Sequence, residues 1–487
     1  MGAGPAGLTA AYELLKHDIP VTVVEKDPRQ VGGLARTAEH NGYRFDIGGH
    51  RFFSKNREVE ELWTEILGDE MLTRDRLSRI YYRGRFFAYP IKAVNALWNL
   101  GPFEAALCLA SYARAKLQPI RKPKNLEEWV RNQFGWRLFN IFFKTYTEKV
   151  WGISTKELSA DWAAQRIKSL DLWTVLRTAL LPQRANKHRG EIVTTLIDKF
   201  RYPRFGPGQV WERVAEISRQ KGHPVLLGRS VAAINHVDGR VVSVVTRDGD
   251  GKIEVHLGTD FISSIPIREL IARLDPPAPE HVRRAADSLS YRDFISIALM
   301  INRADVFPDN WIYIHEPGVL VGRMQNFKNW SPSMVPDQSR TCLGLEYFCF
   351  EGDGLWSTDD AALVELARGE LAQLGICRPE EVFDGVVVRQ PKAYPVYDDS
   401  YQANVAVVRD WLARELPNLH LAGRNGMHKY NNQDHSMMTA LLVARNIAEG
   451  TALDPWKVNA DAVYHEDVRA GDPDRTGRQV PERVAAT

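Results

Sequence analysis

Residues 1–7 read MGAGPAG, and three of them follow the pattern G-x-G-x-x-G at Gly2, Gly4 and Gly7. An apolar, helix-forming run continues to Leu15, and a β-branched run then ends in the acid Glu25, 18 residues after Gly7. Glycines permit a tight turn and a close approach of the backbone to a pyrophosphate, whose charge lies at the N-terminus of the following helix. An acid at this distance can accept hydrogen bonds from a ribose hydroxyl. The stretch therefore predicts a Rossmann-type dinucleotide-binding unit, with a structural loop as the alternative.

A Rossmann unit also needs a strand before its glycine turn. The numbering has no room for such a strand before Gly2. We expect either that the start of the chain has been misassigned or trimmed, or that another segment fills this place. We also expect no secretory signal peptide, because the opening lacks a charged region followed by an apolar one.

The composition is that of an ordinary globular protein: 487 residues, 44% hydrophobic and 25% charged, with a formal net charge of +2. A near-neutral balance gives no reason to expect nucleic acid as a partner. The four cysteines show no C-x-x-C spacing, which argues against a zinc site and fits a reducing compartment, the cytoplasm. No apolar run approaches about 18 residues, so we expect no spanning helix, although an apolar helical hairpin at 95–117 allows peripheral membrane contact.

A second glycine pair follows Glu25, in the stretch KDPRQVGGLART at residues 26–37. Dehydrogenases that bind only NAD do not need this pair. Together, residues 2–37 resemble the FAD-binding group that includes amine oxidases, protoporphyrinogen oxidase, phytoene desaturases and UDP-galactopyranose mutases. The resemblance implies FAD as the cofactor. It also implies cofactor contacts from Gly2, Gly4, Gly7, Glu25, Lys26, Gly32, Gly33, Leu34 and, in a later strand, Val231.

Residues 45–53 read FDIGGHRFF. Adjacent glycines let the backbone pass close to a flat ligand while His50 presents an imidazole to it; an ordinary loop histidine is the alternative. The loop is similar to that of UDP-galactopyranose mutases, especially the eukaryotic type, which implies that Gly48, Gly49 and His50 lie next to the flavin.

Residues 423–436 read GRNGMHKYNNQDHS and predict a turn that enters a helix. The N–H groups at such a helix start can bind an anionic or polar ligand, and a simple helix cap by Asp434 or Ser436 is the alternative. The stretch resembles the eukaryotic-type mutases. That resemblance implies cofactor contacts from Gly423, Arg424, Gln433, Asp434 and Ser436, and substrate contacts from Tyr430 and Asn432.

Two arginines resemble the pair that binds the substrate diphosphate in these mutases. Arg201 lies in FRYPRFGPG at 200–208, and Arg323 follows Gly322. Guanidinium groups pair with phosphate in a bidentate geometry, whereas most single arginines are solvated surface charges. A Tyr-Pro pair at Tyr394 resembles a further substrate contact. The resemblance thus implies His50, Arg323 and Tyr430 as catalytic residues, and Arg201, Arg323, Tyr394, Tyr430 and Asn432 as substrate-binding residues.

The predicted fold is α/β, with a discontinuous Rossmann-type FAD-binding domain, a mixed-sheet substrate domain and a helical insertion. The expected ranges are 1–57, 199–287 and 401–456 for the FAD-binding domain, 58–198 for the largely helical insertion, 288–400 for the substrate domain, and 457–487 for a C-terminal tail.

Three functions are compatible with these patterns. The first is a flavoenzyme similar to UDP-galactopyranose mutase, an isomerase that acts on a nucleotide-linked sugar through the reduced flavin. An external reductant or NAD(P)H would then serve as a partner. The second is an FAD-dependent oxidoreductase of the amine oxidase, protoporphyrinogen oxidase or desaturase type, and the third is a non-enzymatic flavin-binding scaffold. We find no Ser/His/Asp triad and no metal-ligand cluster in the sequence, and we expect no bound metal.

Overall fold

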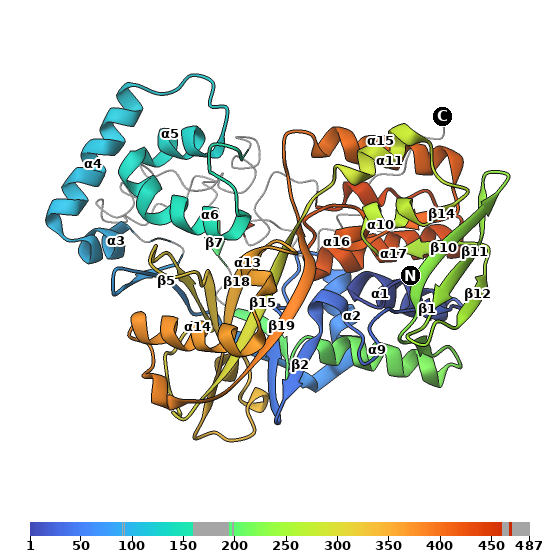
Figure 1. Ribbon diagram of the computed structural model, residues 1–487, viewed down its shortest axis with the longest axis horizontal. Coiled ribbons are helices and arrows are strands. Elements are labelled where there is room, and N and C mark those ends of the chain that lie inside the picture. The colour runs from blue at the N-terminus through green and yellow to red at the C-terminus, as the bar shows by residue number, and fades with distance from the viewer. Residues whose placement is uncertain (90, 92, 159–193, 197–198, 460–466, 470–487) are drawn as a thin grey trace, which may run out of the picture.

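A computed structural model of the chain describes residues 1–487 except 90, 92, 159–193, 197–198, 460–466 and 470–487. Figure 1 shows a nucleotide-binding half on the right, a second half built on a large mixed sheet, and a group of helices at the upper left. The α/β fold expected from the sequence is confirmed, since helices and a mixed multi-stranded sheet make up both halves.

Short parallel strands surround the glycine turn. They are β1 (Val23–Val24) with β9 (Val225–Leu226), and β13 (Phe261–Ser263) with β20 (Leu419–Leu421). The backbone of Met1 and Gly2 lies between the two pairs. Met1 N donates to the carbonyl of Ile262 (2.8 Å), and the carbonyl of Met1 accepts from Ser264 N (3.0 Å). Gly2 N donates to the carbonyl of Val24 (2.9 Å). Met1 and Gly2 therefore lie between β1 and β13, where the end of the first Rossmann strand is expected.

Four helices pack around these strands. They are α1 (Pro5–Lys16), α2 (Arg57–Leu67), α9 (Gly208–Gln220) and α17 (Gln433–Glu449). The helix predicted after the glycine turn is confirmed as α1, and the helix predicted at the end of the turn at 423–436 is confirmed as α17. The two approach closely because small residues meet between them: Ala6, Ala10, Ala422 and Ala440 form one buried cluster.

A four-stranded sheet flanks this region. Its strands are β10 (Ser230–Val237), β11 (Arg240–Arg247) and β12 (Ile253–Leu257), which are antiparallel, and β14 (Leu274–Asp275), which is parallel to β10. The helices beside it are α10 (Ile267–Ala272), α11 (Glu280–Asp287) and α15 (Tyr401–Glu415). Residues of this sheet and of these helices share one apolar core, so the sheet is tied to the nucleotide-binding half.

The large sheet of the second half has seven strands. In sheet order they are β19 (Val382–Pro395), β15 (Tyr291–Ile301), β18 (Thr341–Cys349), β17 (Arg323–Asn326), β16 (Trp311–Ile314), β5 (Ser78–Tyr82) and β6 (Arg85–Ala88). Only the contact between β16 and β5 is parallel. Strands β15 and β18 are buried along their whole length because α14 (Asp360–Gln373) packs on one face, while Phe45, Phe327 and Trp330 pack on the other.

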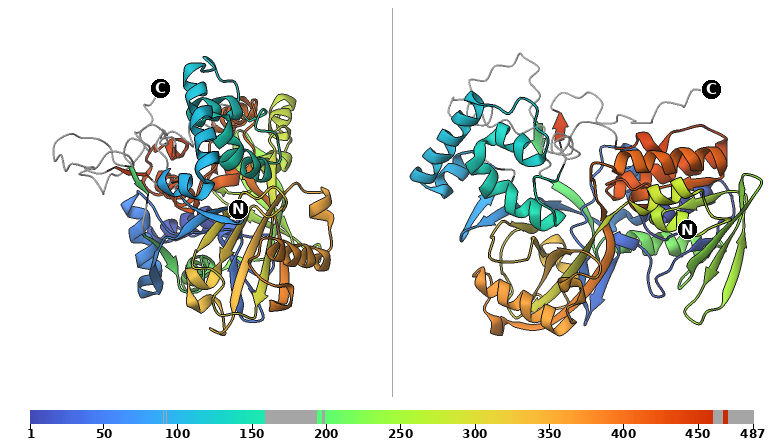
Figure 2. Two further views of the ribbon diagram at one scale, coloured as in Figure 1. Left: turned by 90° about the vertical axis from the view of Figure 1, so that its left-hand side faces the viewer. Right: turned by 45° about the horizontal axis from the view of Figure 1, so that its top comes forward.

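The helical group contains α3 (Ala93–Leu100), α4 (Pro102–Leu117), α5 (Leu126–Phe139) and α6 (Thr145–Trp151) (Figure 2). Helices α3 and α4 form the hairpin predicted at 95–117. The β5–β6 hairpin falls within the largely helical range 58–198, and it confirms the hairpin that the sequence predicts there, turning at Arg83-Gly84. It extends the large sheet, and its residues Ile80 and Phe87 pack under this helical group. The domain boundaries stay predictions, and most of the expected tail lies outside the described residues.

The remaining elements are short. They comprise the pairs β2 (Thr37–His40) with β3 (Tyr43–Asp46), β4 (Met71–Asp75) with β8 (Lys199–Pro203), and β7 (Thr194–Leu196) with β21 (Asp467–Arg469), and the helices α12 (Phe327–Trp330), α13 (Gly354–Ser357) and α16 (Gly423–Gly426). All four cysteines are buried and unpaired. Among the described residues, no helix is long and apolar enough to cross a membrane, and no cluster of three or more His, Cys, Asp or Glu residues could hold a metal ion.

Candidate functional site

The glycine turn at residues 2–7 leaves no room for side chains. A Cβ atom on Gly7 would collide with the carbonyl oxygen of Gly2, and one on Gly2 would collide with the hydroxyl of Ser264. Gly2 also has φ +90°, a conformation that residues with a Cβ rarely adopt. No side chain caps α1, and residues 4–6 at its N-terminus line a cavity. This helix end therefore presents uncapped backbone to the cavity, as a phosphate site requires.

The second glycine pair packs directly on the first. A Cβ on Gly33 would lie 3.2 Å from the Cα of Gly4, and Gly32 N donates to the carbonyl of Ala3 (2.8 Å). Arg36 then fixes the loop from the other side, because its Nη1 donates to the carbonyl of Gly33 (2.9 Å). The two motifs thus form one continuous wall rather than two separate loops.

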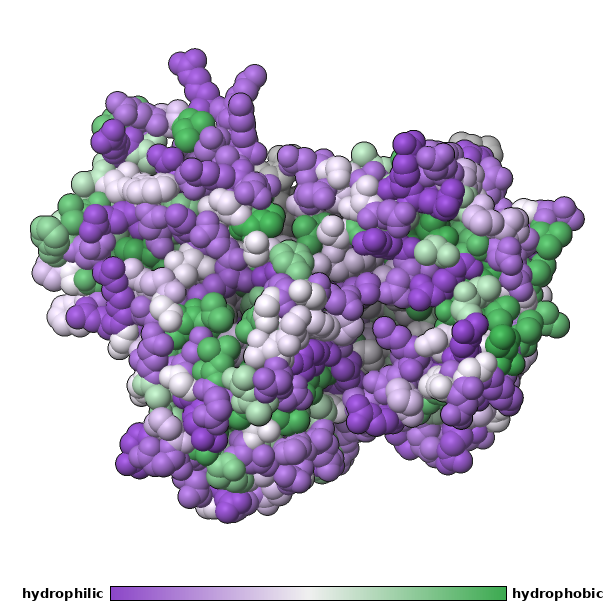
Figure 3. Space-filling model, viewed as in Figure 1, coloured by the Kyte–Doolittle hydropathy of each residue, from purple (hydrophilic) through white to green (hydrophobic). Residues whose placement is uncertain are grey.

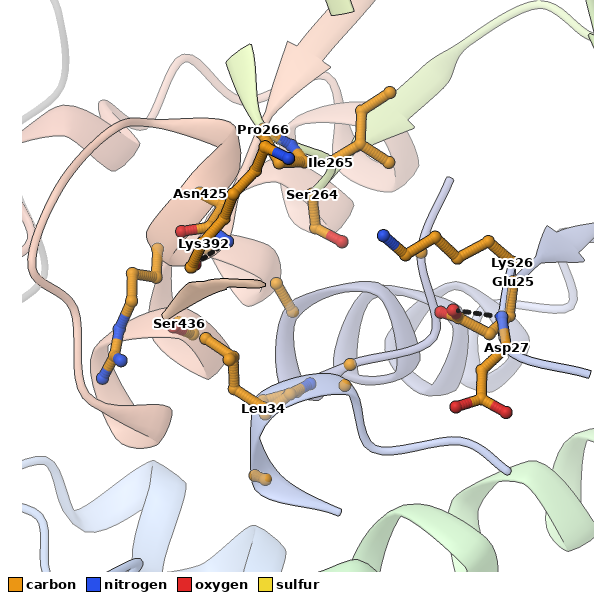
Figure 4. Close-up of a pocket in the computed structure, with 18 of the residues that line it drawn as sticks. Glu25, Lys26, Asp27, Leu34, Ser264, Ile265, Pro266, Lys392, Asn425 and Ser436 are labelled. Carbon is orange, nitrogen blue, oxygen red and sulfur yellow. Dashed lines mark hydrogen bonds between the residues drawn. The ribbon is translucent and has the colours of Figure 1, made fainter. Parts of the chain in front are cut away.

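Glu25 ends β1 at the edge of the same cavity. Its Oε2 accepts a hydrogen bond from Ala3 N (2.7 Å) and its Oε1 accepts one from Asp27 N (2.9 Å). Figure 4 shows Glu25 on one side of the cavity and Ser436 and Asn425 on the other, with Ser264 between the two sides. Segments from the beginning, middle and end of the chain therefore meet around one space of about 500 Å³.

Most residues predicted to bind the cofactor line this cavity. They are Gly2, Gly4, Glu25, Lys26, Gly33, Leu34, His50, Val231, Gly423, Arg424, Gln433 and Ser436. The others lie beside it: Gly7 and Gly32 support the glycine turns, Gly48 and Gly49 precede His50, and buried Asp434 accepts a hydrogen bond from Ser54 Oγ (3.1 Å). Contact between any of these residues and a cofactor stays a prediction.

Arg323 and Glu346 form an ion pair on neighbouring strands. They face each other across β17 and β18, with Arg323 Nε 2.5 Å from Glu346 Oε2. Gln325 Nε2 donates to the other carboxylate oxygen (2.7 Å), and the Glu346 side chain is 0% exposed. Burial raises the pKa of Glu346, while Arg323 and Gln325 oppose this effect. Burial alone would lower the pKa of Arg323, but the Glu346 carboxylate holds it well above its ordinary value. Arg323 therefore stays charged.

The glycine loop before His50 lies on this ion pair. A Cβ on Gly49 would lie 2.9 Å from Gln325 Nε2, and one on Gly48 would lie 3.7 Å from Arg323 Nη2. His50 Nδ1 lies 3.2 Å from the carbonyl oxygen of Gly48. Burial, together with the positive charges of Arg424 and Arg323, lowers the pKa of His50 to about 3. The imidazole is consequently neutral at pH 7.

Two tyrosines complete the cluster. The rings of Tyr394 and Tyr430 stack with centroids 5.5 Å apart and planes inclined by 14°. The Arg424 guanidinium lies 5.4 Å from the first ring centroid and 5.1 Å from the second. Burial and the neighbouring Tyr430 raise the pKa of Tyr394 to about 12, so its phenol keeps its proton at neutral pH. Burial also raises the pKa of Tyr146, which lies within electrostatic reach of Arg323 and Tyr394. The structure thus brings His50, Arg323, Tyr394 and Tyr430 together, while their catalytic and substrate-binding roles stay predictions.

Two of the predicted substrate residues have other contacts. Arg201 donates to Thr64 Oγ1 (2.8 Å) and lies 3.4 Å from Glu60 Oε2, so its guanidinium is held against α2. The reason is strand alternation: Phe200 and Tyr202 point into the core beside Trp330, which turns Arg201 to the opposite side. Asn432 is the N-cap of α17, and its N–H donates to His435 Nδ1 (3.3 Å), whereas its neighbour Asn431 lines the cavity.

A model of one protein family, described as flavin containing amine oxidoreductase, matches residues 5–448. The chain belongs to this family. Two curated relatives match a third of the chain: dTDP-fucopyranose mutase of Escherichia coli is 28% identical over 170 residues, and the probable UDP-galactopyranose mutase of Klebsiella pneumoniae is 27% identical over 169 residues. These matches span 33% of this chain but only 43% and 42% of the relatives' own lengths.

Solved structures share the fold across nearly the whole chain. A reduced UDP-galactopyranose mutase superposes with a TM-score of 0.79 at 22% identity, covering 94% of this chain and 96% of its own. A putative protoporphyrinogen oxidase from Exiguobacterium sp. 255-15 superposes with a TM-score of 0.68 at 17% identity, covering 92% and 98%. At such identities these likenesses show the fold alone.

Membership of a flavin-containing family makes a flavin the cofactor to test against this cavity. The glycine walls leave the close approach that a pyrophosphate needs. Within the part of the chain that the structure describes, no group hydrogen-bonds to the buried Gln433 Oε1 or Asn425 Oδ1, and both side chains line the cavity. Buried polar atoms usually have a partner, so a polar cofactor fits the residues present.

Several lining residues of this flavoprotein were missed by the sequence analysis. They are Arg36, Arg229, Ser264, Ile265, Pro266, Glu269, Arg273, Gln390, Lys392, Asn425 and Asn431. Ser264 directly follows β13 (Phe261–Ser263), and the end of a parallel strand is where ligands bind in α/β sheets. That rule could have found Ser264. Lys392 carries no comparable signal, because its position depends on an ion pair with Glu269 (3.0 Å).

Proposed function

We propose that the protein binds FAD in this cavity and, with the flavin reduced, isomerises a nucleotide-linked sugar between its pyranose and furanose forms. One observation carries the proposal: the charged Arg323 lies beside the neutral His50 and the stacked pair Tyr394–Tyr430, and His50 itself lines the cavity. The likeness to two mutases of nucleotide-linked sugars supports it.

The FAD would lie along the walls in a fixed order. Its pyrophosphate belongs at the uncapped N-terminus of α1 and its ribose hydroxyls at Glu25, where an acid closes β1. The flavin ring belongs beside residues 48–50, because His50 lines the cavity and the two glycines before it carry no side chain that would keep a flat ring away from the backbone. When bound and reduced, the flavin supplies the nucleophile for the anomeric carbon of the sugar.

Arg323 binds the diphosphate of the substrate in this scheme. Its Nε and Nη2 are oriented by Glu346, so the guanidinium is held in place before the substrate arrives. A fixed cation stabilises negative charge that grows on a departing diphosphate without any rearrangement of water. Gln325 helps by fixing the second oxygen of Glu346.

Tyr394 and His50 act without changing charge. The high pKa of Tyr394 leaves its hydroxyl as a hydrogen-bond donor for phosphate oxygens. Because the pKa of His50 is low, its imidazole is neutral and adds no positive charge beside the flavin ring. Tyr430 is held by stacking and by Arg424, so the aromatic pair forms a rigid wall for the sugar.

The reductant is proposed to be external or NAD(P)H, and the place of work is proposed to be the cytoplasm, which four buried, unpaired thiols fit. An FAD-dependent oxidoreductase is the second candidate, because the family itself is described as an amine oxidoreductase. In that case the cavity would accept an amine or an alkyl chain whose hydride passes to the flavin.

Binding to the reduced protein separates the two candidates. The flavin is reduced with dithionite under anaerobic conditions, and its absorbance is followed while a UDP-sugar or dTDP-sugar is added. The mutase proposal predicts saturable binding that is tighter in the reduced than in the oxidised form. Stoichiometric bleaching of the oxidised flavin by an amine, with oxygen consumed and no response to nucleotide sugars, would support the oxidoreductase and contradict the mutase.

A further inference from the structure

Helix α4 has an apolar side that faces inward and a second apolar side that faces out. Its inner side buries Ala105, Cys108 and Tyr112. The packing on α5 is close, because a Cβ on Gly135 would lie 2.7 Å from the backbone nitrogen of Tyr112. The inner side thus accounts for how the helix is anchored, and the outer side needs a separate explanation.

The outer side is a regular stripe. Exposed apolar residues repeat at intervals of three and four along α4, and with the end of α3 they form what we call the α4 face: Trp98, Phe103, Ala106, Ala110, Ala113 and Leu117. Such spacing places side chains on one side of a helix. Trp98 is 85% exposed, Phe103 76% and Leu117 83%. Figure 3 shows apolar side chains at the left edge of the molecule, where α3 and α4 lie in Figure 1.

Positive charge gathers next to this face. Residues 93–124 contain one acid, Glu104, and five bases, which are Arg114, Lys116, Arg121, Lys122 and Lys124. Glu104 is already paired with Arg137 on α5, so it does not offset the neighbouring bases. The five bases are exposed. A chain of net charge +2 therefore concentrates local positive charge beside its exposed apolar helix.

We propose that the α4 face docks on an anionic lipid surface. Apolar side chains on one side of a helix enter the boundary between headgroups and acyl chains, and tryptophan rests at headgroup depth. Basic residues beside it are attracted by anionic headgroups. A second copy of the chain fits less well, because two such faces would bring ten cations together. The inference is independent of the proposed chemistry.

Vesicle flotation tests the proposal with the full-length flavin-loaded protein. Vesicles of phosphatidylcholine and phosphatidylglycerol are compared with vesicles of phosphatidylcholine alone. We expect the protein to float with the anionic vesicles and to dissociate as salt rises, since the attraction between cations and headgroups is screened. We also expect brominated acyl chains to quench part of the tryptophan fluorescence, and Trp98→Phe to remove that quenching.

Matched variants assign the contact to residues. Phe103→Ser combined with Leu117→Ser should weaken binding at least tenfold, and Arg121→Gln combined with Lys122→Gln and Lys124→Gln should weaken it at least tenfold on anionic vesicles. The control replaces exposed apolar residues elsewhere, Ile253→Ser with Leu257→Ser on β12, which are 56% and 83% exposed. The control should bind vesicles as the unchanged protein does.

Three results would overturn the proposal. One is failure of the unchanged, flavin-loaded protein to float with anionic vesicles. Another is equal loss of binding in the α4-face and β12 variants. The third is a concentration-dependent dimer in solution that the α4-face variant abolishes without any vesicle binding, which would assign the face to a second copy. Bound flavin and the thermal unfolding midpoint, measured for each variant, distinguish a lost surface from a lost fold.

Discussion

At the scale of single residues, Arg323 owes its charge and its orientation to one partner. Glu346 is fully buried and accepts from both Arg323 and Gln325, so neither member of the pair is free to move. Removing one member of a buried ion pair leaves the other uncompensated, at a cost of about 3–5 kcal/mol. Loss of ligand binding and loss of stability must therefore be separated in any test of Arg323.

The double variant Arg323→Gln with Glu346→Gln makes that separation. Both charges disappear together, so the free energy of unfolding should stay closer to that of the unchanged protein than in Arg323→Gln alone. The affinity of the reduced protein for a UDP-sugar should nevertheless fall about 10- to 100-fold, the worth of a charge-assisted phosphate contact. Urea unfolding and anaerobic titration measure the two quantities.

The control for this experiment is Arg414→Ala with Glu415→Ala, an exposed ion pair at the end of α15. It should change neither quantity. Unaltered affinity in the Arg323 double variant would remove Arg323 from the substrate site, whatever happens to stability.

At the scale of elements, the walls of the cavity depend on glycines rather than on polar side chains. The turn before α1 and the loop at 32–33 touch each other through Gly4 and Gly33, and a methyl group on Gly33 would lie 3.2 Å from the Gly4 Cα and push the walls apart. Position 7 is tighter still, because its Cβ would enter the space of the Gly2 carbonyl. Flavin retention should be the first property to fail.

We expect Gly7→Ala to lower the affinity for flavin by more than tenfold, in line with about 1–3 kcal/mol for overpacking a tight contact. The flavin-to-protein absorbance ratio after desalting measures the effect. Gly249→Ala is the control, because a Cβ there meets nothing within 4 Å. Full flavin retention in Gly7→Ala would show that the turn does not hold the pyrophosphate.

Contacts between elements also decide how much of the fold and of the site can be predicted from the sequence. Local patterns are enough for α1, for Glu25 at the end of β1 and for α17, because each rests on spacing within one segment. They are not enough for Arg201, whose direction is set by which strand β8 pairs with, or for Lys392, whose place is set by Glu269 on another element. Sequence motifs therefore predicted most of the glycines that line the cavity, but not the lining residues at the end of β13 and on β19.

At the scale of the whole molecule, one cavity joins segments from both ends of the chain, and burial there and nearby changes proton affinities. Burial lowers the pKa of His315 to about 3 and that of His428 to about 4. Both side chains are buried, and His315 stacks on Tyr146 with planes inclined by 5°. Each such histidine is neutral in the folded protein and takes up a proton when the chain unfolds at mildly acidic pH.

The free energy of unfolding should consequently fall as the pH falls below about 6.5, the ordinary pKa of histidine in an unfolded chain. The stabilisation from a neutral buried histidine is fully present above that pH. It is lost progressively as the pH falls from about 6.5 to the pKa of the histidine in the folded protein. His315→Phe, which keeps the stacking, should reduce the loss between pH 7 and pH 5 by about 2 kcal/mol in urea unfolding. His281→Phe at an exposed site is the control, and an unchanged pH slope in His315→Phe would contradict the account.

The central claim, that this member of the flavin-containing family isomerises a nucleotide-linked sugar, is tested most directly by the ring form of the product. The flavin-loaded protein is reduced with dithionite without oxygen, incubated with UDP-galactopyranose or a dTDP-linked 6-deoxysugar, and the pyranose and furanose forms are separated by chromatography. We expect the two ring forms to interconvert to equilibrium with only a catalytic amount of reductant and without any oxidised sugar. An unchanged ring form with every nucleotide sugar offered, together with oxygen consumption on an amine or alkyl substrate, would contradict the claim.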